Sequence, residues 1–129
     1  MSGKFGLIIE DEEDLATIFS EALKAGGFQT EIIYDGLIAR QRLNEVRPDV
    51  VVLDLNLPHV DGNQLLNQIR ADPRLEKTRV LVATADSGMA NMLDSEADLI
   101  LLKPISFVQL RMMAERLGMP EEETQGAEL

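Results

Sequence analysis

The sequence predicts an α/β fold in which a five-stranded parallel sheet, in the order 2-1-3-4-5, is covered by helices on both faces. Strand-like and helix-like patterns alternate along the chain, which is typical of β-α units joined by right-handed crossovers. At least three of the strand-like runs are apolar without interruption, as expected for strands that are covered on both faces. A chain of 129 residues has the length of one domain with its own core. We therefore expect a three-layer sandwich.

Five segments carry the strand pattern, and four of them lead directly into reactive or charged side chains. The segments are Phe5–Ile9, Thr30–Tyr34, Val50–Leu53, Val80–Thr84 and Leu99–Leu102. Glu10-Asp11 follows the first, Asp54 follows the third, the fourth ends in Thr84, and Lys103 follows the fifth. An acid or a base at the end of an apolar strand is unfavourable unless it has a partner or a function. The strand ends therefore predict a site.

Helical spacing fills the intervals between the first four strand segments. The apolar stripes are Leu15, Ile18, Phe19, Ala22 and Leu23, then Ala39, Leu43 and Val46, then Leu65, Leu66 and Ile69. Gly26-Gly27 ends the first helix, Pro48 limits the second, and Asp72-Pro73 ends the third, because glycine and proline interrupt helices. Each unit thus has the strand-then-helix order of a parallel sheet.

The last helix has the clearest signals. Ser106 with Gln109 forms a capping-box pattern, and Gly118 followed by Pro120 marks the end. The apolar stripe between them is Leu110, Met113, Ala114 and Leu117.

Two other segments are weakly specified. In Ser87–Ala97 only Met89, Met92 and Leu93 suggest a short helix. Residues 120–129 are acidic and nearly free of large apolar side chains, so we predict a disordered tail after a domain of residues 1–119.

The second strand segment selects the strand order, because it ends in the turn sequence Tyr34-Asp35-Gly36. Placing it at an edge gives the order 2-1-3-4-5 and makes strands 1, 3 and 4 neighbours. Ligands bind such sheets at the carboxyl ends of the strands, where the order reverses. The acids after strands 1 and 3 would meet Thr84 there, and Lys103 would reach in from the other edge.

The composition excludes some classes of function. A net charge of -11 argues against nucleic-acid binding by this domain alone. The chain has no cysteine, which excludes disulfides and thiolate metal sites and favours a cytoplasmic setting. The start of the sequence lacks the apolar core of a signal peptide, and no run reaches transmembrane length, so we expect no membrane association.

The predicted cluster of acids favours a hard cation and phosphoryl chemistry. Glu10, Asp11 and Asp54 would repel one another by a few kcal/mol per pair at an effective dielectric constant of about 20. Oxygen ligands without histidine or cysteine favour Mg²⁺, which suits phosphoryl transfer. Asp54 could then be a carboxylate nucleophile, with Lys103 pairing with a phosphate oxygen and Thr84 donating its hydroxyl.

These motifs together resemble the receiver domain of two-component response regulators, over about Phe5 to Leu117. The family's acidic pair matches Glu10-Asp11, and its phospho-acceptor matches Asp54 in Val-Val-Leu-Asp-Leu-Asn-Leu-Pro. Its later motifs match Asp61-Gly62, Thr84-Ala85 and Lys103-Pro104. The resemblance implies a flavodoxin-like (βα)5 fold and a lysine-proline bond that is commonly cis.

The resemblance also implies a ligand set and partners. Mg²⁺, for which Mn²⁺ can substitute, would be held by Asp11, Asp54 and the Asn56 carbonyl, with Glu10 acting through water. Asp54 would accept a phosphoryl group from a histidine kinase or a histidine phosphotransfer protein, so the chain would catalyse at most its own phosphorylation and dephosphorylation. The downstream effector is not named by the sequence. A readout or homodimer surface would lie within about Ser87–Leu117.

The sequence departs from the family pattern at a few positions. The first acid is Glu10 where aspartate is common, which would alter the water around the ion. Ile100 replaces the usual phenylalanine or tyrosine three residues before the lysine, so no aromatic ring can swing inward. Glu96-Ala97-Asp98 replaces Gly-Ala-Asp, and Ile105 stands where phenylalanine is frequent.

Three other functions compete with a switching receiver. A haloacid-dehalogenase-type phosphatase needs a second aspartate where Asn56 stands. A flavodoxin electron carrier would need a phosphate-binding loop after the first strand. That position holds the five acids of residues 10–14, which would repel a flavin phosphate. A receiver-like interaction module that no longer switches is favoured by Ile100 and opposed by the complete acid, threonine and lysine set. His59, the only histidine, is expected to be a solvent-facing loop residue.

Overall fold

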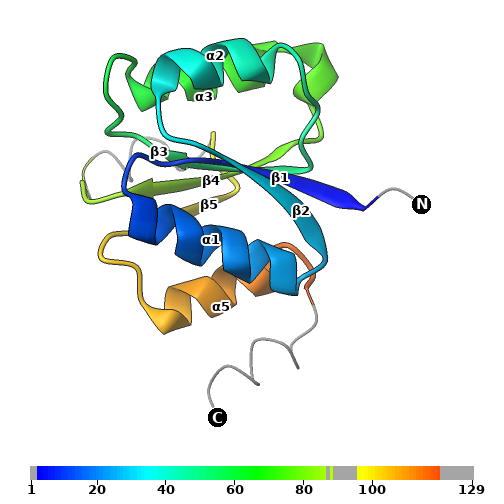
Figure 1. Ribbon diagram of the computed structural model, residues 1–129, viewed down its shortest axis with the longest axis vertical. Helices are drawn as coiled ribbons and strands as arrows, with labels where there is room; N and C mark the ends of the chain where they lie inside the picture. The colour runs from blue at the N-terminus through cyan, green and yellow to red at the C-terminus, as the bar shows by residue number, and fades with distance from the viewer. Residues whose placement is uncertain (1–2, 87, 89–95, 120–129) are drawn as a thin grey trace.

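The computed structural model describes residues 3–86, 88 and 96–119, and it contains a parallel sheet in the order β2-β1-β3-β4-β5 (Figure 1). The strands are β1 (Lys4–Ile9), β2 (Phe28–Ile33), β3 (Val50–Asp54), β4 (Arg79–Thr84) and β5 (Leu99–Leu102). The predicted fold class and strand order are confirmed. The second strand begins two residues before the predicted Thr30, because Phe28 is buried and already pairs with Lys4 of β1.

Helices form a layer on each side of the sheet, so the chain is a three-layer sandwich (Figure 1). α1 (Glu13–Ala25) and α5 (Phe107–Arg116) lie on one face. α2 (Gly36–Leu43) and α3 (Gly62–Ala71), followed by the short 3-10 helix η1 (Pro73–Leu75), lie on the other. Among the described residues, no helix is both long and apolar enough to cross a membrane.

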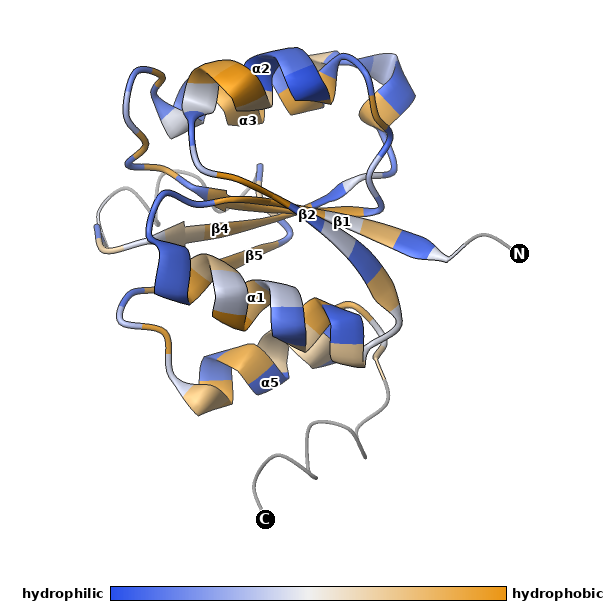
Figure 2. Cartoon of the chain, viewed as in Figure 1, coloured by the Kyte–Doolittle hydropathy of each residue, from blue (hydrophilic) through white to orange (hydrophobic). Residues whose placement is uncertain are grey.

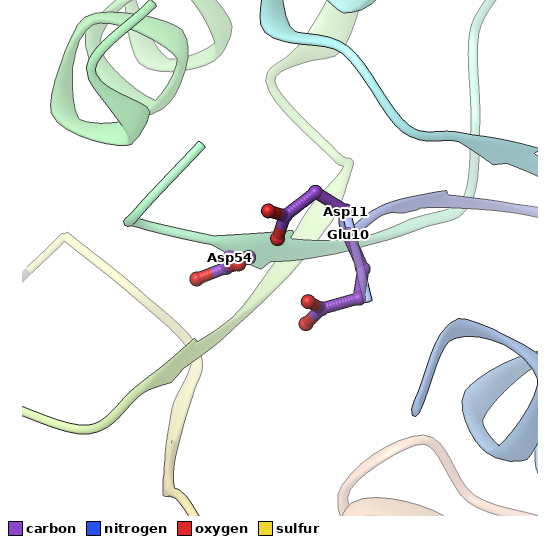
Figure 3. Close-up of side chains that lie close together, drawn as sticks. All are labelled: Glu10, Asp11 and Asp54. Carbon is purple, nitrogen blue, oxygen red and sulfur yellow. The ribbon is translucent and has the colours of Figure 1, made fainter. Parts of the chain in front are cut away.

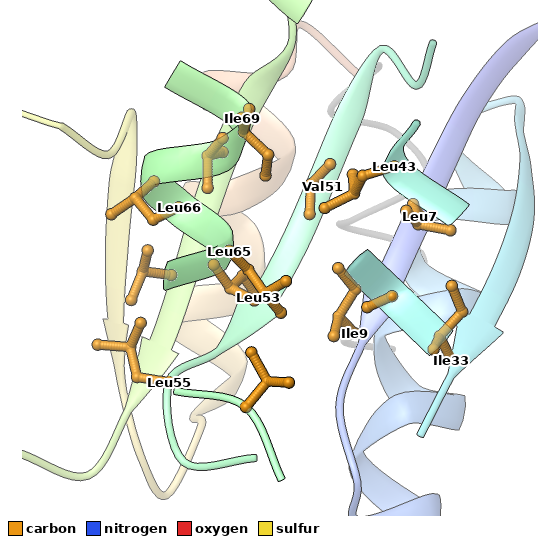
Figure 4. Packing of buried hydrophobic residues seen from close by; sticks show 14 of the residues in the cluster. Leu7, Ile9, Ile33, Leu43, Val51, Leu53, Leu55, Leu65, Leu66 and Ile69 are labelled. Atoms are coloured by element: carbon orange, nitrogen blue, oxygen red, sulfur yellow. The ribbon is translucent and has the colours of Figure 1, made fainter. Parts of the chain in front are cut away.

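The two faces of the sheet form two separate apolar cores. Leu7, Val51 and Leu53 point towards α2 and α3, where they contact Leu65 and other residues of one cluster (Figure 4). Ile8 and Val52 belong to the second cluster, towards α1 and α5. All five residues of β3 are buried. β4 and β5 are consequently apolar along most of their length, whereas the edge strand β2 also carries polar residues (Figure 2). Burial on both faces explains the uninterrupted apolar runs in the sequence.

Two predictions about the helices are corrected by the packing. Ile18, assigned to the apolar stripe of α1, is 47% exposed, and Ser20 is buried in its place with a hydrogen bond of 2.7 Å to the Thr30 hydroxyl. A polar group inside the core is tolerated because it has that partner. Val46 lies outside α2, which ends at Leu43, and it packs against the core from the loop that follows a turn at residues 44–45.

The end of the chain is described only in part. The capping box of α5 is half formed: Ser106 Oγ accepts a hydrogen bond from the N–H of Gln109 at 3.2 Å, but the Gln109 side chain bonds to Leu102 instead. The predicted helix at Ser87–Ala97 lies mainly outside the described residues, as does the predicted tail at 120–129.

Candidate functional site

Three carboxylates lie together beyond the ends of β1 and β3 (Figure 3). Glu10 and Asp11 follow β1, Asp54 is the last residue of β3, and one oxygen of each lies within 4.8 Å of the others. Glu10 is 0% exposed and Asp54 is 1% exposed, whereas Asp11 faces solvent. The sheet order brings these acids together because β1 and β3 are neighbours with parallel register. The predicted meeting of the three acids is thus observed.

Lys103 reaches the same group from the end of β5. Its Nζ lies 3.2 Å from Glu10 Oε1 and 3.4 Å from Asp54 Oδ2, and it donates a hydrogen bond of 3.3 Å to Glu10 Oε2. Glu10 Oε1 is buried, and within the described residues it has this ion pair but no partner in hydrogen-bond geometry. The Lys103-Pro104 peptide bond is cis, as the resemblance implies.

The cluster carries more negative than positive charge, and this changes how its members bind protons. Burial raises the pKa of Glu10 to about 7, and the charge of Asp54 adds to that effect. Partial burial and a hydrogen bond with Asp54 raise the pKa of Asp11. Burial alone would lower the pKa of Lys103, but the charges of Asp54 and Glu10 outweigh it and raise that pKa. The site therefore retains protons, or attracts a cation in their place.

The loop after Asp54 orients the carboxylate and opens onto a cavity of about 610 Å³. The N–H of Asn56 donates to Asp54 Oδ1 at 2.9 Å. Asp11, Asn56 and Thr84 line the cavity together with Leu55, Leu57, Pro58, Asp61, Asn63 and Asp86. The Thr84 hydroxyl oxygen is buried and accepts a hydrogen bond from the N–H of Asp86 at 3.1 Å. All predicted site residues therefore lie together at the carboxyl ends of the strands.

The donor set fits a hard divalent cation. Three carboxylates supply oxygen atoms, and Glu10 Oε1 is a buried oxygen without a hydrogen-bond donor among the described residues. Mg²⁺ prefers a few carboxylate ligands and retains waters, and the open cavity beside Asp11 gives room for them.

His59 and Gly62 contribute to the shape of this loop. His59 has a positive φ of 71°, its side chain is 63% exposed, and Nδ1 lies 3.5 Å from Asp35 Oδ2, in line with a solvent-facing loop residue. The N–H of Gly62 donates to the Leu55 carbonyl at 3.1 Å. This bond holds the start of α3 against the loop that follows Asp54 (residues 55–61, the acceptor loop).

A parallel α/β sandwich with an acidic pocket and a lysine at the carboxyl ends of its strands defines a class of domain whose pocket is typical of phospho-accepting sites. Residues 7–115 match the response regulator receiver domain. The chain belongs to this family of two-component signalling domains, and it is not a classical enzyme.

Individual relatives agree with this assignment. The phosphate regulon transcriptional regulatory protein PhoB of Rhizobium meliloti (strain 1021) is 35% identical over 106 residues, which are 80% of this chain and 47% of that protein. The chain thus spans about half the length of the curated relatives it matches. A receiver domain (CheY-like) from Methylobacillus flagellatus is 30% identical with a TM-score of 0.75, covering 88% of this chain and 98% of that one.

A further solved structure bears on the metal. The receiver domain of sensor histidine kinase PA1611 from Pseudomonas aeruginosa PAO1, which has a magnesium ion coordinated in its active site cleft, is 25% identical with a TM-score of 0.76. The match covers 91% of this chain and 99% of that one. The present chain offers three clustered carboxylates at the same kind of site.

One contact was missed from the sequence. Gln109 was assigned only to the cap of α5, but its amide bonds to both backbone groups of Leu102, directly before Lys103. A glutamine at the third helical position has an ordinary explanation as a capping residue. No sequence pattern distinguished the two uses.

Proposed function

We propose that this chain accepts a phosphoryl group on Asp54, in a Mg²⁺-dependent reaction, and that the resulting acyl phosphate changes its binding to a partner. The observation that carries the proposal is the orientation of the Asp54 carboxylate. One oxygen accepts the Asn56 N–H, and the other faces the Lys103 ammonium. Such a carboxylate is held in place for nucleophilic attack.

The reaction would begin with a carboxylate oxygen of Asp54 attacking the phosphorus atom of a phosphohistidine. The new P–O bond forms as the P–N bond breaks, and the imidazole nitrogen of the donor takes the electron pair. Lys103 would pair with a phosphoryl oxygen. Thr84 would donate its hydroxyl proton to another, because its oxygen already accepts from Asp86. Bound Mg²⁺, held by Asp11, Asp54 and the Asn56 carbonyl, would neutralise charge on the transferring group.

Membership of the receiver family implies a cognate histidine kinase. We propose that a histidine kinase or a histidine phosphotransfer protein supplies the phosphoryl group and that a downstream effector protein responds to it. Leu102, Phe107, Val108 and Met112 are large apolar side chains that are exposed on β5 and α5. We assign effector binding or homodimer formation to this surface.

Intact-mass measurement tests the proposal. With acetyl phosphate and Mg²⁺, the parent chain should gain one phosphoryl group, which base removes. Asp54→Asn should abolish the adduct, while Asp14→Asn, which changes an exposed acid of α1 outside the cluster, should keep it. No adduct on the parent, or an adduct that persists in Asp54→Asn, would refute it.

A module that binds partners without switching remains the second candidate. Ile100 favours it, because this side chain is half-buried and packs against the apolar core beneath α2 and α3. Acetyl phosphate distinguishes the two: a non-switching module would bind its partner equally with and without the adduct.

A further inference from the structure

Gln109 forms contacts that its capping role does not explain. Its Oε1 accepts a hydrogen bond from the N–H of Leu102 at 2.7 Å, and its Nε2 donates to the carbonyl of Leu102 at 2.8 Å. Nε2 also lies 3.4 Å from the Pro104 carbonyl. A side-chain amide that bonds both backbone groups of one residue imitates the pairing of a further strand. These contacts immobilise the strand end on both sides of Lys103.

The place of these contacts is significant because β5 is an edge strand. In the order β2-β1-β3-β4-β5 it has a neighbour on one side only. Towards β4, the N–H of Lys103 donates to the Thr84 carbonyl at 2.9 Å. On the side that has no neighbouring strand, the Gln109 side chain forms hydrogen bonds with the N–H and the carbonyl of Leu102. Lys103 is thus held from the sheet on one side and from α5 on the other.

The Leu102 side chain cannot supply this anchoring. It is 41% exposed, so little burial energy holds the strand end in place, and Pro104 has no N–H to donate. Lysine has a flexible four-carbon stem, so a fixed backbone restricts the positions that its ammonium can take beside Glu10 and Asp54.

We propose that Gln109 is a positioning residue that holds the backbone at Lys103 so that the ammonium faces Asp54. The inference rests on the proposed function, because Lys103 is the group that would meet the transferred phosphoryl group. The side chain of Gln109 bonds to Leu102 and Pro104 and not to the carboxylates of the site. It acts through Leu102, and it joins the end of β5 to the first turn of α5, which presents Phe107 and Val108 to solvent.

Three variants separate positioning from helix stability. Gln109→Leu keeps the volume and the helix propensity but removes every hydrogen bond to Leu102 and Pro104. Gln109→Glu keeps an acceptor for the Leu102 N–H and places a charge against the two carbonyls. Ser106→Ala removes the cap of α5 and leaves the Gln109 side chain in place, so it is the matched control.

The first measurement is the maximal rate of acyl phosphate formation at saturating acetyl phosphate and Mg²⁺. Misplacing a reacting group by about 1 Å can reduce a rate by up to about 100-fold, and we expect about tenfold for Gln109→Leu, with Gln109→Glu between it and the parent. Mg²⁺ binding should not weaken, because the carboxylates keep their places and the ammonium that competes for them has moved away. Ser106→Ala should react like the parent.

The second measurement does not require phosphorylation. In the ¹H–¹³C spectrum, the ε-methylene signal of Lys103 should be shifted from that of the exposed Lys77 in the parent and should move towards it in Gln109→Leu. If the parent forms no adduct, the proposed function fails, and this signal still decides the role of Gln109. Unchanged signal in Gln109→Leu, or an equal change in Ser106→Ala, would overturn the inference.

Discussion

The Lys103 ammonium lies 3.2 Å from Glu10 Oε1, although the two residues are 93 positions apart in the chain. The lysine is shared, because Asp54 Oδ2 lies 3.4 Å from the same nitrogen. One positive charge therefore faces two buried carboxylates, with Asp11 close by. Burial, and then the charge of Asp54, raises the pKa of Glu10, and the excess negative charge of the cluster attracts a cation.

The first prediction concerns stability against pH in the absence of divalent metal. The pKa of Glu10 rises from 4.5 to about 7 on folding, because of burial and then the charge of Asp54. Between these values the folded chain binds more protons than the unfolded chain, so the free energy of unfolding falls as pH rises. The shift corresponds to on the order of a few kcal/mol in total. Glu10→Gln should remove this decrease.

Urea unfolding at a series of pH values, with a chelator present, measures this effect. The comparison is between the slopes of the parent and Glu10→Gln from about pH 4.5 to 7, and Glu12→Gln, an exposed neighbour, is the control. Parallel curves for the parent and Glu10→Gln would contradict the assigned cause.

The second prediction is that the chain binds one Mg²⁺ or Mn²⁺ weakly through Asp11, Asp54 and the Asn56 carbonyl. Asp11→Ala should abolish binding, because the remaining buried acids already share Lys103. Calorimetry, or water relaxation with Mn²⁺, measures it, with Asp14→Ala as control. Unchanged affinity in Asp11→Ala would place the ion elsewhere.

Much of the fold and the site could be predicted from the sequence because a strand segment carries two kinds of information, its apolar character and the reactive residue at its end. Val50–Asp54 is apolar until it ends in an acid, so one segment indicates both a buried parallel strand and a reactive residue at its carboxyl end. The turn at Tyr34-Asp35-Gly36 then indicated the edge strand and hence the strand order, which the structure confirms.

What the sequence could not predict depends on contacts between distant segments. The interior position of Ser20 requires the Thr30 hydroxyl opposite it, and spacing alone favours Ile18. Gln109 has two possible partners, and only the path of β5 beside α5 selects Leu102. Hydrophobic periodicity records the type of an element but not which polar partner lies opposite.

The third prediction tests the corrected face of α1. Phe19 is 0% exposed within the core between α1 and the sheet, so Phe19→Ala should lower the free energy of unfolding by about 3–5 kcal/mol. Ile18→Ala, one residue away and 47% exposed, should change it by no more than about 0.5 kcal/mol. Chemical denaturation measures both. Equal decreases in the free energy of unfolding for the two variants would show that Ile18 is part of the buried face of α1, as predicted from the sequence.

The last prediction concerns Gly62, where the start of α3 meets the acceptor loop. A Cβ atom at this position would lie 2.5 Å from Leu55 Cα and 2.8 Å from the Asp54 carbonyl oxygen. These are backbone atoms, which cannot move without shifting the loop that orients Asp54. Gly62→Ala should therefore lower the free energy of unfolding by about 1–3 kcal/mol and also weaken Mg²⁺ binding.

Gly26 offers a matched control for Gly62→Ala, since a Cβ there would overlap with the side chain of Met119. That neighbour is a flexible side chain, which can adopt another rotamer. Gly26→Ala should then destabilise the chain less than Gly62→Ala and leave Mg²⁺ affinity unchanged. Denaturation and metal titration of both variants decide the matter. If Gly62→Ala binds Mg²⁺ as the parent does, the glycine serves only the packing of α3, and the acceptor loop keeps its geometry without it.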